Sequence, residues 1–165
     1  MRYTKQQQET IKIMKEYMKT IRQLKRERFH LMEEYNQLPS ISSPTLEENK
    51  GTPISQITRM NDYTQRRELL LKRIEIFNQY IDQFMLYTLL LSTRQRQMIN
   101  AYMNTLSYAE MVEQLENEYY ISISTYKREL PEICLSLSHI CHHIEIPTFD
   151  KINDEFYQKC VKDMI

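Results

Sequence analysis

Residues 92–130, STRQRQMINAYMNTLSYAEMVEQLENEYYISISTYKREL, are the most informative part of this chain. It holds three short segments whose apolar residues recur at helical spacing, and each follows a serine that can cap a helix. Ser92 and Ser107 are followed three residues later by Gln95 and Glu110, which is the capping-box pattern. The sequence therefore predicts short helices at about 93–104, 107–117 and 123–130.

Pro131 marks the next expected break. Proline lacks the backbone N–H and its ring clashes with the preceding helical turn. We therefore expect Pro131 to close or kink the third short helix, with a further helix running from Pro131 to about His143. Beyond it, residues 144–165 form an amphipathic C-terminal tail that is predicted to be helical. Its apolar positions are Ile152, Phe156, Cys160 and Val161.

The first part of the chain, residues 1–91, predicts two long helices. Apolar residues recur at spacings of three, four and one seven over residues 4–38, and Arg28 interrupts this stripe. The positions of this stripe are Ile11, Met14, Met18, Ile21, Leu24, Leu31, Tyr35 and Leu38. Helical spacing resumes over residues 55–91, at Ile57, Met60, Leu70, Leu71, Ile74, Phe77, Ile81, Phe84, Met85 and Leu91. Residues 39–54 separate the two helices and contain three of the five prolines and the only glycine, so they predict a Ser/Pro loop. The two helices could form an antiparallel hairpin or a coiled coil with a second copy, which makes a homodimer one option. The expected fold class is all-α.

The order of short helices in residues 92–143 is typical of a helix-turn-helix module. Its third helix begins with hydroxyl residues and then a basic pair, which suit contacts to phosphates and base edges in the major groove. The buried side of that helix is expected to carry Tyr126, Leu130 and Ile133. An ordinary capped helix in a bundle is the alternative. The candidate DNA-binding residues are Ser122, Ser124, Thr125, Lys127 and Arg128.

Three segments carry a family resemblance: Leu91–Tyr102, Leu106–Glu110 and Ile121–Arg128. In order and spacing they resemble the ArpU/RinA-type phage transcriptional regulators, and the resemblance covers roughly residues 1–140. It implies a DNA-binding module similar to region 4 of sigma factors. It also implies an activator of late genes in a phage or phage satellite, which binds double-stranded promoter DNA and acts with RNA polymerase in the cytoplasm of a bacterial host.

Two features depart from that family pattern. The turn before Ile121 is longer than in the family, and Asn117 is expected to be its left-handed residue. The second short helix is also acidic, and carboxylates near phosphate weaken DNA binding. An alternative function is therefore a protein-interaction module, an anti-activator or co-activator that binds RNA polymerase or another phage regulator. The acidic residues are Glu110, Glu113, Glu116 and Glu118.

Charge and composition narrow the remaining classes. With one glycine, Gly51, the chain lacks the glycine-rich loops of dinucleotide and P-loop sites. The net charge is zero, but residues 1–38 hold nine Lys or Arg against five Asp or Glu. These basic residues could be a solvated helix face with pairs such as Glu16 with Lys12 or Lys19, or they could touch DNA or an acidic partner. Most of them are Lys12, Lys15, Lys19, Arg22, Lys25, Arg26 and Arg28.

The remaining motifs favour no enzyme, cofactor or metal. The paired carboxylates lie at helix ends or in loops, and no nucleophile motif is present. Cys134 and Cys141 are seven residues apart, and His139, His142 and His143 do not complete zinc-ligand spacing, so we expect buried thiols beside surface histidines. No apolar run reaches the length of a membrane span, and no signal peptide is expected.

Overall fold

The computed structural model describes residues 2–38 and 53–162, with side chains for residues 2–38 and 61–162, and all regular elements in these ranges are helical. The predicted all-α fold is confirmed. Residues 39–52 of the predicted Ser/Pro loop lie outside the described residues. The second long helix begins at Pro53, so the last two residues of the predicted loop are helical. The elements are α1 (Lys5–Gln37), α2 (Pro53–Thr88), α3 (Thr93–Asn104), α4 (Tyr108–Asn117), α5 (Ile123–Ile140), α6 (Phe149–Phe156) and the π-helical turn η1 (Tyr157–Val161).

Helix α1 begins at a complete capping box. The Thr4 hydroxyl accepts the backbone N–H of Gln7, and the Gln7 side chain accepts the backbone N–H of Thr4. The predicted apolar stripe is largely confirmed as the buried side of the helix, and Tyr35 and Leu38 pack at its edge. Tyr17, which the spacing argument omitted, is also fully buried. The buried residues of α1 are Ile11, Met14, Tyr17, Met18, Ile21, Leu24 and Leu31.

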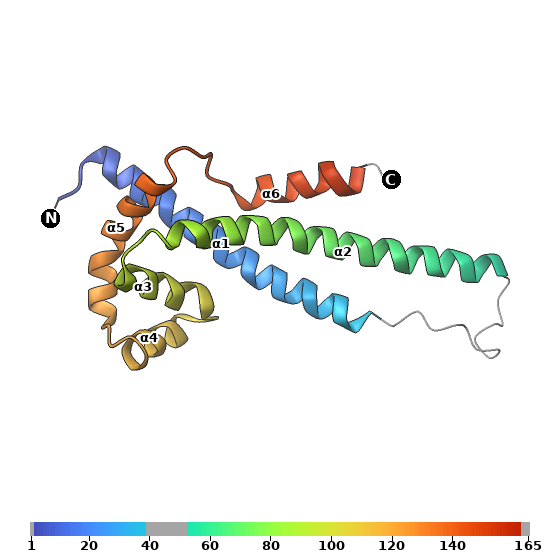
Figure 1. Ribbon diagram of the computed structural model, residues 1–165, viewed down its shortest axis with the longest axis horizontal. Coiled ribbons are helices and arrows are strands. Elements are labelled where there is room, and N and C mark those ends of the chain that lie inside the picture. Colours follow the sequence, from blue (N-terminus) through green and yellow to red (C-terminus); the bar gives the residue numbers. More distant parts are fainter. Residues whose placement is uncertain (1, 39–52, 163–165) are drawn as a thin grey trace.

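Helices α1 and α2 pack against each other and run in opposite directions (Figure 1). The Tyr17 and Phe84 rings meet edge to face with centroids 5.0 Å apart. Arg28 interrupts the apolar stripe, and its guanidinium donates to Asn78 Oδ1 at 2.9 Å. The polar position is therefore accommodated by a hydrogen bond across the helix pair, which satisfies a half-buried charged group.

Helix α2 ends at Thr88, three residues before its predicted end at Leu91. The backbone N–H groups of residues 89, 90 and 91 bond to carbonyls three residues earlier, which tightens and closes the last turn. Leu91 is buried as predicted, whereas Leu89 and Leu90 are exposed. Leu71, assigned to the apolar stripe from its spacing, is also exposed, and Ile76 is buried instead. The predicted stripe residues Ile57 and Met60 lie outside the described side chains.

Helix α5 corrects the predicted break at Pro131. A single helix runs from Ile123 to Ile140, with the proline inside it. Tyr126 is buried before the proline, and Ile133 and Leu137 are buried after it. Because both halves are anchored in the same core, where α5 packs on α1, tertiary packing outweighs the lost hydrogen bond at Pro131.

Helix α6 lies along α2, on the side away from α3 and α4 (Figure 1). Ile152 is fully buried, and the Arg73 guanidinium of α2 lies 5.6 Å from the centre of the Phe156 ring. Residues from the long helices, the α3–α5 region and α6 thus contribute to one hydrophobic core. Within the described residues, no helix combines the length and apolar character needed to cross a bilayer.

Candidate nucleic-acid interface

Helices α3, α4 and α5 form a compact group at one end of the molecule, where α5 packs across α1 (Figure 1). The predicted capping box at Ser92 and Gln95 is confirmed in both directions. The one predicted at Ser107 is only half correct. The Ser107 hydroxyl accepts from Glu110 N, but the Glu110 carboxylate accepts from Leu106 N at 2.9 Å instead of from Ser107 N.

The turn between α4 and α5 contains a left-handed residue, but it is Tyr120 and not Asn117. Asn117 is the last residue of α4, whereas Tyr120 has φ of 57° and a side chain that is 88% exposed. Ile121 N donates to Leu115 O at 2.8 Å, so the turn closes over six residues. Because this hydrogen bond spans the end of α4, the chain reverses direction after Asn117. A non-glycine residue with a left-handed backbone, such as Tyr120, carries strain.

The first turn of α5 is fixed by two of the predicted site residues. The Ser122 hydroxyl accepts from Thr125 N at 3.2 Å, and the two side-chain hydroxyls lie 2.9 Å apart in a hydrogen bond. Ser122 is exposed and Thr125 is half-buried. Both hydroxyls thus serve the helix cap first, and their remaining lone pairs are what a ligand could reach.

The other three predicted residues lie together on the exposed side of α5. Ser124, Lys127 and Arg128 are all exposed, and spacings of three and four residues place them on one helix face. Tyr126 lies between them in sequence and is buried, and Ile133 is buried further along, as predicted. Leu130 is partly buried against the same core. Burial raises the pKa of the Tyr126 phenol far above its usual range, so this anchor stays neutral.

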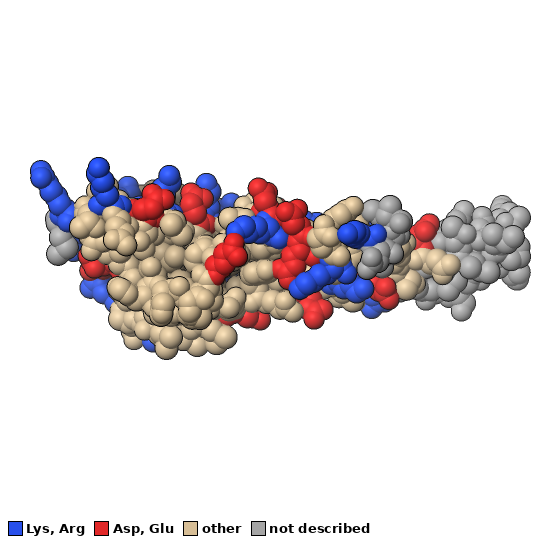
Figure 2. All heavy atoms as spheres, turned by 90° about the horizontal axis from the view of Figure 1, so that it is seen from above, with Lys and Arg blue, Asp and Glu red and all other residues tan. Residues whose placement is uncertain are grey.

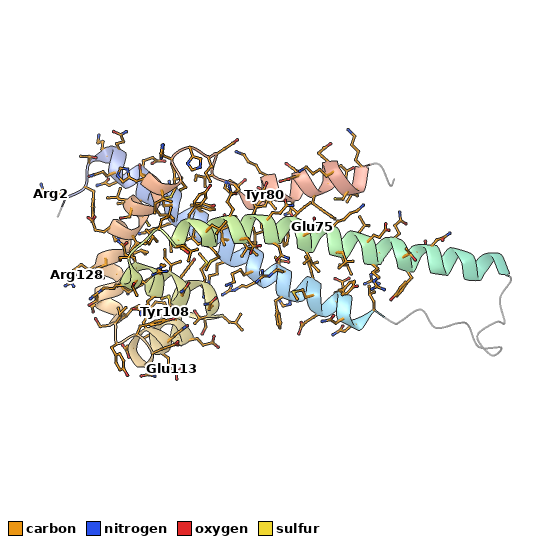
Figure 3. All side chains as sticks on the ribbon, viewed as in Figure 1. Arg2, Glu75, Tyr80, Tyr108, Glu113 and Arg128 are labelled. Carbon is orange, nitrogen blue, oxygen red and sulfur yellow. The ribbon has the colours of Figure 1, made fainter. Side chains whose placement is uncertain are left out.

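The sequence pattern missed Tyr108 as a neighbour of this face. The Lys127 ammonium lies 5.7 Å from the centre of the Tyr108 ring, so an aromatic face from α4 borders the basic residues. Figure 3 shows Tyr108 on α4 and Arg128 at the outer side of α5. Tyr108 is the first residue of its helix and is exposed, which apolar periodicity alone does not reveal.

Carboxylates border this region as well. Arg94 of α3 pairs with Glu129 of α5 at 3.1 Å, so Arg94 adds no net positive charge beside α5. The four acidic residues of α4 and its C-terminal end are all exposed. Glu113 lies at the lower edge of α4 in Figure 3, on a different side of the group from Arg128. The basic face of α5 is therefore small and lies next to an acidic helix.

The basic residues of α1 contact the end of α3. Arg22 donates to the carbonyl of Thr105 at 2.9 Å, Lys25 donates to Asn104 Oδ1 at 2.6 Å, and Arg26 donates to the carbonyl of Leu106. The Arg22 guanidinium also lies 4.6 Å from the centre of the Tyr102 ring. We call these three residues the α1 clamp.

The clamp changes the interpretation of the basic α1 face. Cations are favourable at a helix C-terminus, where backbone carbonyls lack helical partners. The clamp thus joins the C-terminal end of α3 to α1. Lys12, Lys15 and Lys19 are exposed, and the expected pairing of Glu16 with Lys12 or Lys19 is not among the ion pairs of the described residues. Burial, together with the nearby Arg28 charge, lowers the pKa of Lys25.

The cysteine and histidine residues near the end of α5 are arranged as expected. Cys134 and Cys141 are buried, and His139, His142 and His143 are exposed. Burial raises the pKa of the Cys134 thiol to about 11, so it is a poor thiolate donor. Within the part of the chain that the structure describes, no three His, Cys, Asp or Glu side chains form a group able to hold a metal ion.

Figure 2 shows acidic and basic side chains interspersed over part of one face of the molecule, beside a broad area without charged residues. Mixed charge of this kind gives little attraction to a polyanion.

No protein-family model, curated protein or solved structure matches this chain at a significant level.

Proposed function

We propose that this protein binds double-stranded DNA through the first two turns of α5. The observation that carries the proposal is the exposed face formed by Ser124, Lys127 and Arg128, directly behind the Ser122 cap. Tyr126 and Ile133 hold the opposite side of the same helix in the core. A rigid helix that presents hydroxyl and basic side chains from its N-terminal end matches the demands of major-groove binding.

The chemistry of these residues divides the expected contacts. Lys127 supplies a mobile point charge for phosphate, and Arg128 can form a bidentate pair with guanine or phosphate. Ser124 offers a hydroxyl at the helix N-terminus, where backbone N–H groups also attract phosphate. Ser122 and Thr125 keep the helix end in place and contribute lone pairs.

At the level of biology, we propose a transcription regulator of phage or phage-satellite late genes that acts with RNA polymerase at a promoter. This step depends on the resemblance of Leu91–Tyr102, Leu106–Glu110 and Ile121–Arg128 to the ArpU/RinA-type regulators. The proposed activity is binding and not catalysis.

A direct test measures DNA binding by fluorescence anisotropy and identifies the preferred site by selection from a randomised duplex library. The Lys127→Ala and Arg128→Ala double variant should lose binding to the selected duplex. The matched control is Lys12→Ala with Lys19→Ala, which removes two exposed cations from α1 and should leave binding nearly unchanged. Circular dichroism should show the same helical signal for both. Retained binding by the α5 double variant would refute the site.

A second candidate is a protein-interaction module that binds another regulator or RNA polymerase. The exposed carboxylates of Glu110, Glu113, Glu116 and Glu118 favour it, because they belong to the helix that packs against α5 and to its C-terminal end, and they repel phosphate. A salt titration separates the two. DNA binding should weaken steeply and linearly in log–log form as salt rises, whereas absence of DNA binding together with salt-insensitive binding to purified RNA polymerase favours the second candidate.

A further inference from the structure

A groove of about 540 Å³ lies between the second half of α1 and the turn that joins α3 to α4. Its cationic walls come from the α1 clamp and Arg28, and its apolar walls come from Phe29, Met32 and Leu106, with Met103 beneath. Of the described residues that line it, none is acidic. The groove is separate from the exposed face of α5.

The cations of this groove are held in place by neutral groups. Arg22 and Arg26 donate to backbone carbonyls, and Lys25 and Arg28 donate to asparagine side chains. These contacts fix the directions of the side chains without cancelling their charge. Among the ion pairs of the described residues, none involves these four. The groove therefore keeps a concentrated positive charge with restricted side-chain freedom, which favours an anionic occupant.

Three large apolar side chains that line the groove are exposed to solvent. Phe29 is 59% exposed, Met32 is 48% exposed and Leu106 is 71% exposed. They border the cations, so this surface combines positive charge with large apolar side chains. Aromatic residues, Met and Arg are the types enriched where proteins bind one another.

We propose that this groove binds an acidic segment of a partner protein, one that also carries leucine or phenylalanine side chains. The carboxylates of such a segment would pair with the α1 clamp and Arg28, and its apolar side chains would cover Phe29, Met32 and Leu106. A phosphate backbone would pair with the cations of the groove, but it would not cover the large exposed apolar residues beside them. The charge complementarity and the apolar walls together thus favour a protein segment over DNA.

The position of the groove makes this binding independent of the proposed function. Figure 3 places Arg128 at the outer side of α5, whereas the residues that line the groove belong to α1 and to the end of α3 with the turn that follows it, and none belongs to α5. A partner in the groove and DNA on α5 can therefore be bound at the same time. The groove proposal stands even if α5 binds no DNA.

The test uses a short fluorescein-labelled peptide of Asp, Glu, Leu and Phe with the full-length protein, read by anisotropy. The same peptide with Ser in place of Leu and Phe should bind about tenfold more weakly. Replacing Phe29→Ser and Met32→Ser in the protein should weaken binding of the first peptide by about tenfold as well. Both residues are exposed, so the variant should keep its thermal unfolding midpoint.

The matched control is Leu86→Ser with Leu90→Ser, which removes two apolar residues that are at least as exposed but lie outside the groove, and it should leave the affinity unchanged. Equal binding by wild type and the Phe29 and Met32 variant would overturn the proposal, as would equal loss in the control. Excess duplex DNA should not displace the peptide. Displacement that persists after Lys127→Ala and Arg128→Ala would identify a nucleic-acid site in the groove and also overturn the proposal.

Discussion

Arg22→Met tests the role of the α1 clamp most directly. Methionine keeps the apolar stem of the side chain, so the change removes the guanidinium while leaving most of the packing. The guanidinium donates to the Thr105 carbonyl at 2.9 Å and lies 4.6 Å from the Tyr102 ring centre. Both contacts join α1 to the end of α3, about half of the chain away in sequence.

The magnitude follows from the two contacts and one opposing term. A hydrogen bond from a charged group contributes about 1.5–3 kcal/mol. The cation–π contact adds about 1 kcal/mol at a partly exposed site. Against these, Arg22 Nε is buried and has no hydrogen-bond partner in the described structure, which costs about 1–3 kcal/mol. We expect a net loss of about 1–2 kcal/mol in the free energy of unfolding.

Urea denaturation followed by circular dichroism measures this loss through the midpoint at constant slope. The control is Lys19→Met, which removes an exposed cation from the same helix and should change stability by less than about 0.5 kcal/mol. A double-mutant cycle with Tyr102→Leu should return a coupling of about 1 kcal/mol between Arg22 and the ring.

An unchanged or higher stability of Arg22→Met would refute the clamp. It would mean that the desolvation of the guanidinium and its unpartnered Nε outweigh the hydrogen bond to Thr105. A zero coupling with Tyr102 would refute only the cation–π part. The two results are separable because the cycle cancels contributions that the ring does not share.

Three further predictions concern α5 and the turn before it. Tyr120→Gly should raise the free energy of unfolding by about 0.5–1 kcal/mol in urea, because relief of a left-handed tyrosine exceeds the added chain entropy; a loss of stability would contradict the strain. Pro131→Ala should stabilise by about 1–2 kcal/mol, since it restores a helical hydrogen bond at the cost of a less restricted unfolded chain; destabilisation would show that packing requires the proline. Burial raises the pKa of Tyr126 in the folded state above its usual value of 10.0. The neutral phenol therefore contributes fully to the free energy of unfolding below pH 10, and this contribution is lost as the pH rises above 10. Tyr126→Phe should therefore lose less stability than wild type between pH 10 and pH 11 in parallel urea titrations.

Apolar periodicity and serine caps predicted most helix positions in this chain. Ser92 with Gln95 located the start of α3, and the stripe from Ile11 to Leu31 located the buried side of α1, because both signals are local. At Pro131 the local signal predicts a break that the helix does not have. The local preference of proline against a helix interior is real, but Ile133 and Leu137 are held by α1, and periodicity cannot weigh contacts between distant segments.

The candidate DNA face was predictable only as a set of residue types. The sequence placed Ser124, Lys127 and Arg128 on one face because helical spacing is enough for that. It could not show that Ser122 and Thr125 bond to each other, or that Tyr108 lies beside Lys127. Those facts depend on side-chain rotamers and on the packing of α4 against α5. The left-handed residue is Tyr120 and not the predicted Asn117. The backbone hydrogen bond from Ile121 to Leu115 sets where the turn closes, and residue preference does not encode that bond.

The basic face of α1 shows most clearly why charge patterns do not define sites. Arg22, Lys25 and Arg26 follow helical spacing as a solvated face would, and the sequence gives no acidic partner for them. Their partners are two backbone carbonyls and an asparagine, about 80 residues along the chain. Neutral partners leave no charge signature in a sequence, yet they hold the cations in place without neutralising them. One set of residues can therefore fix α3 on α1 and still present positive charge to the groove beside Phe29.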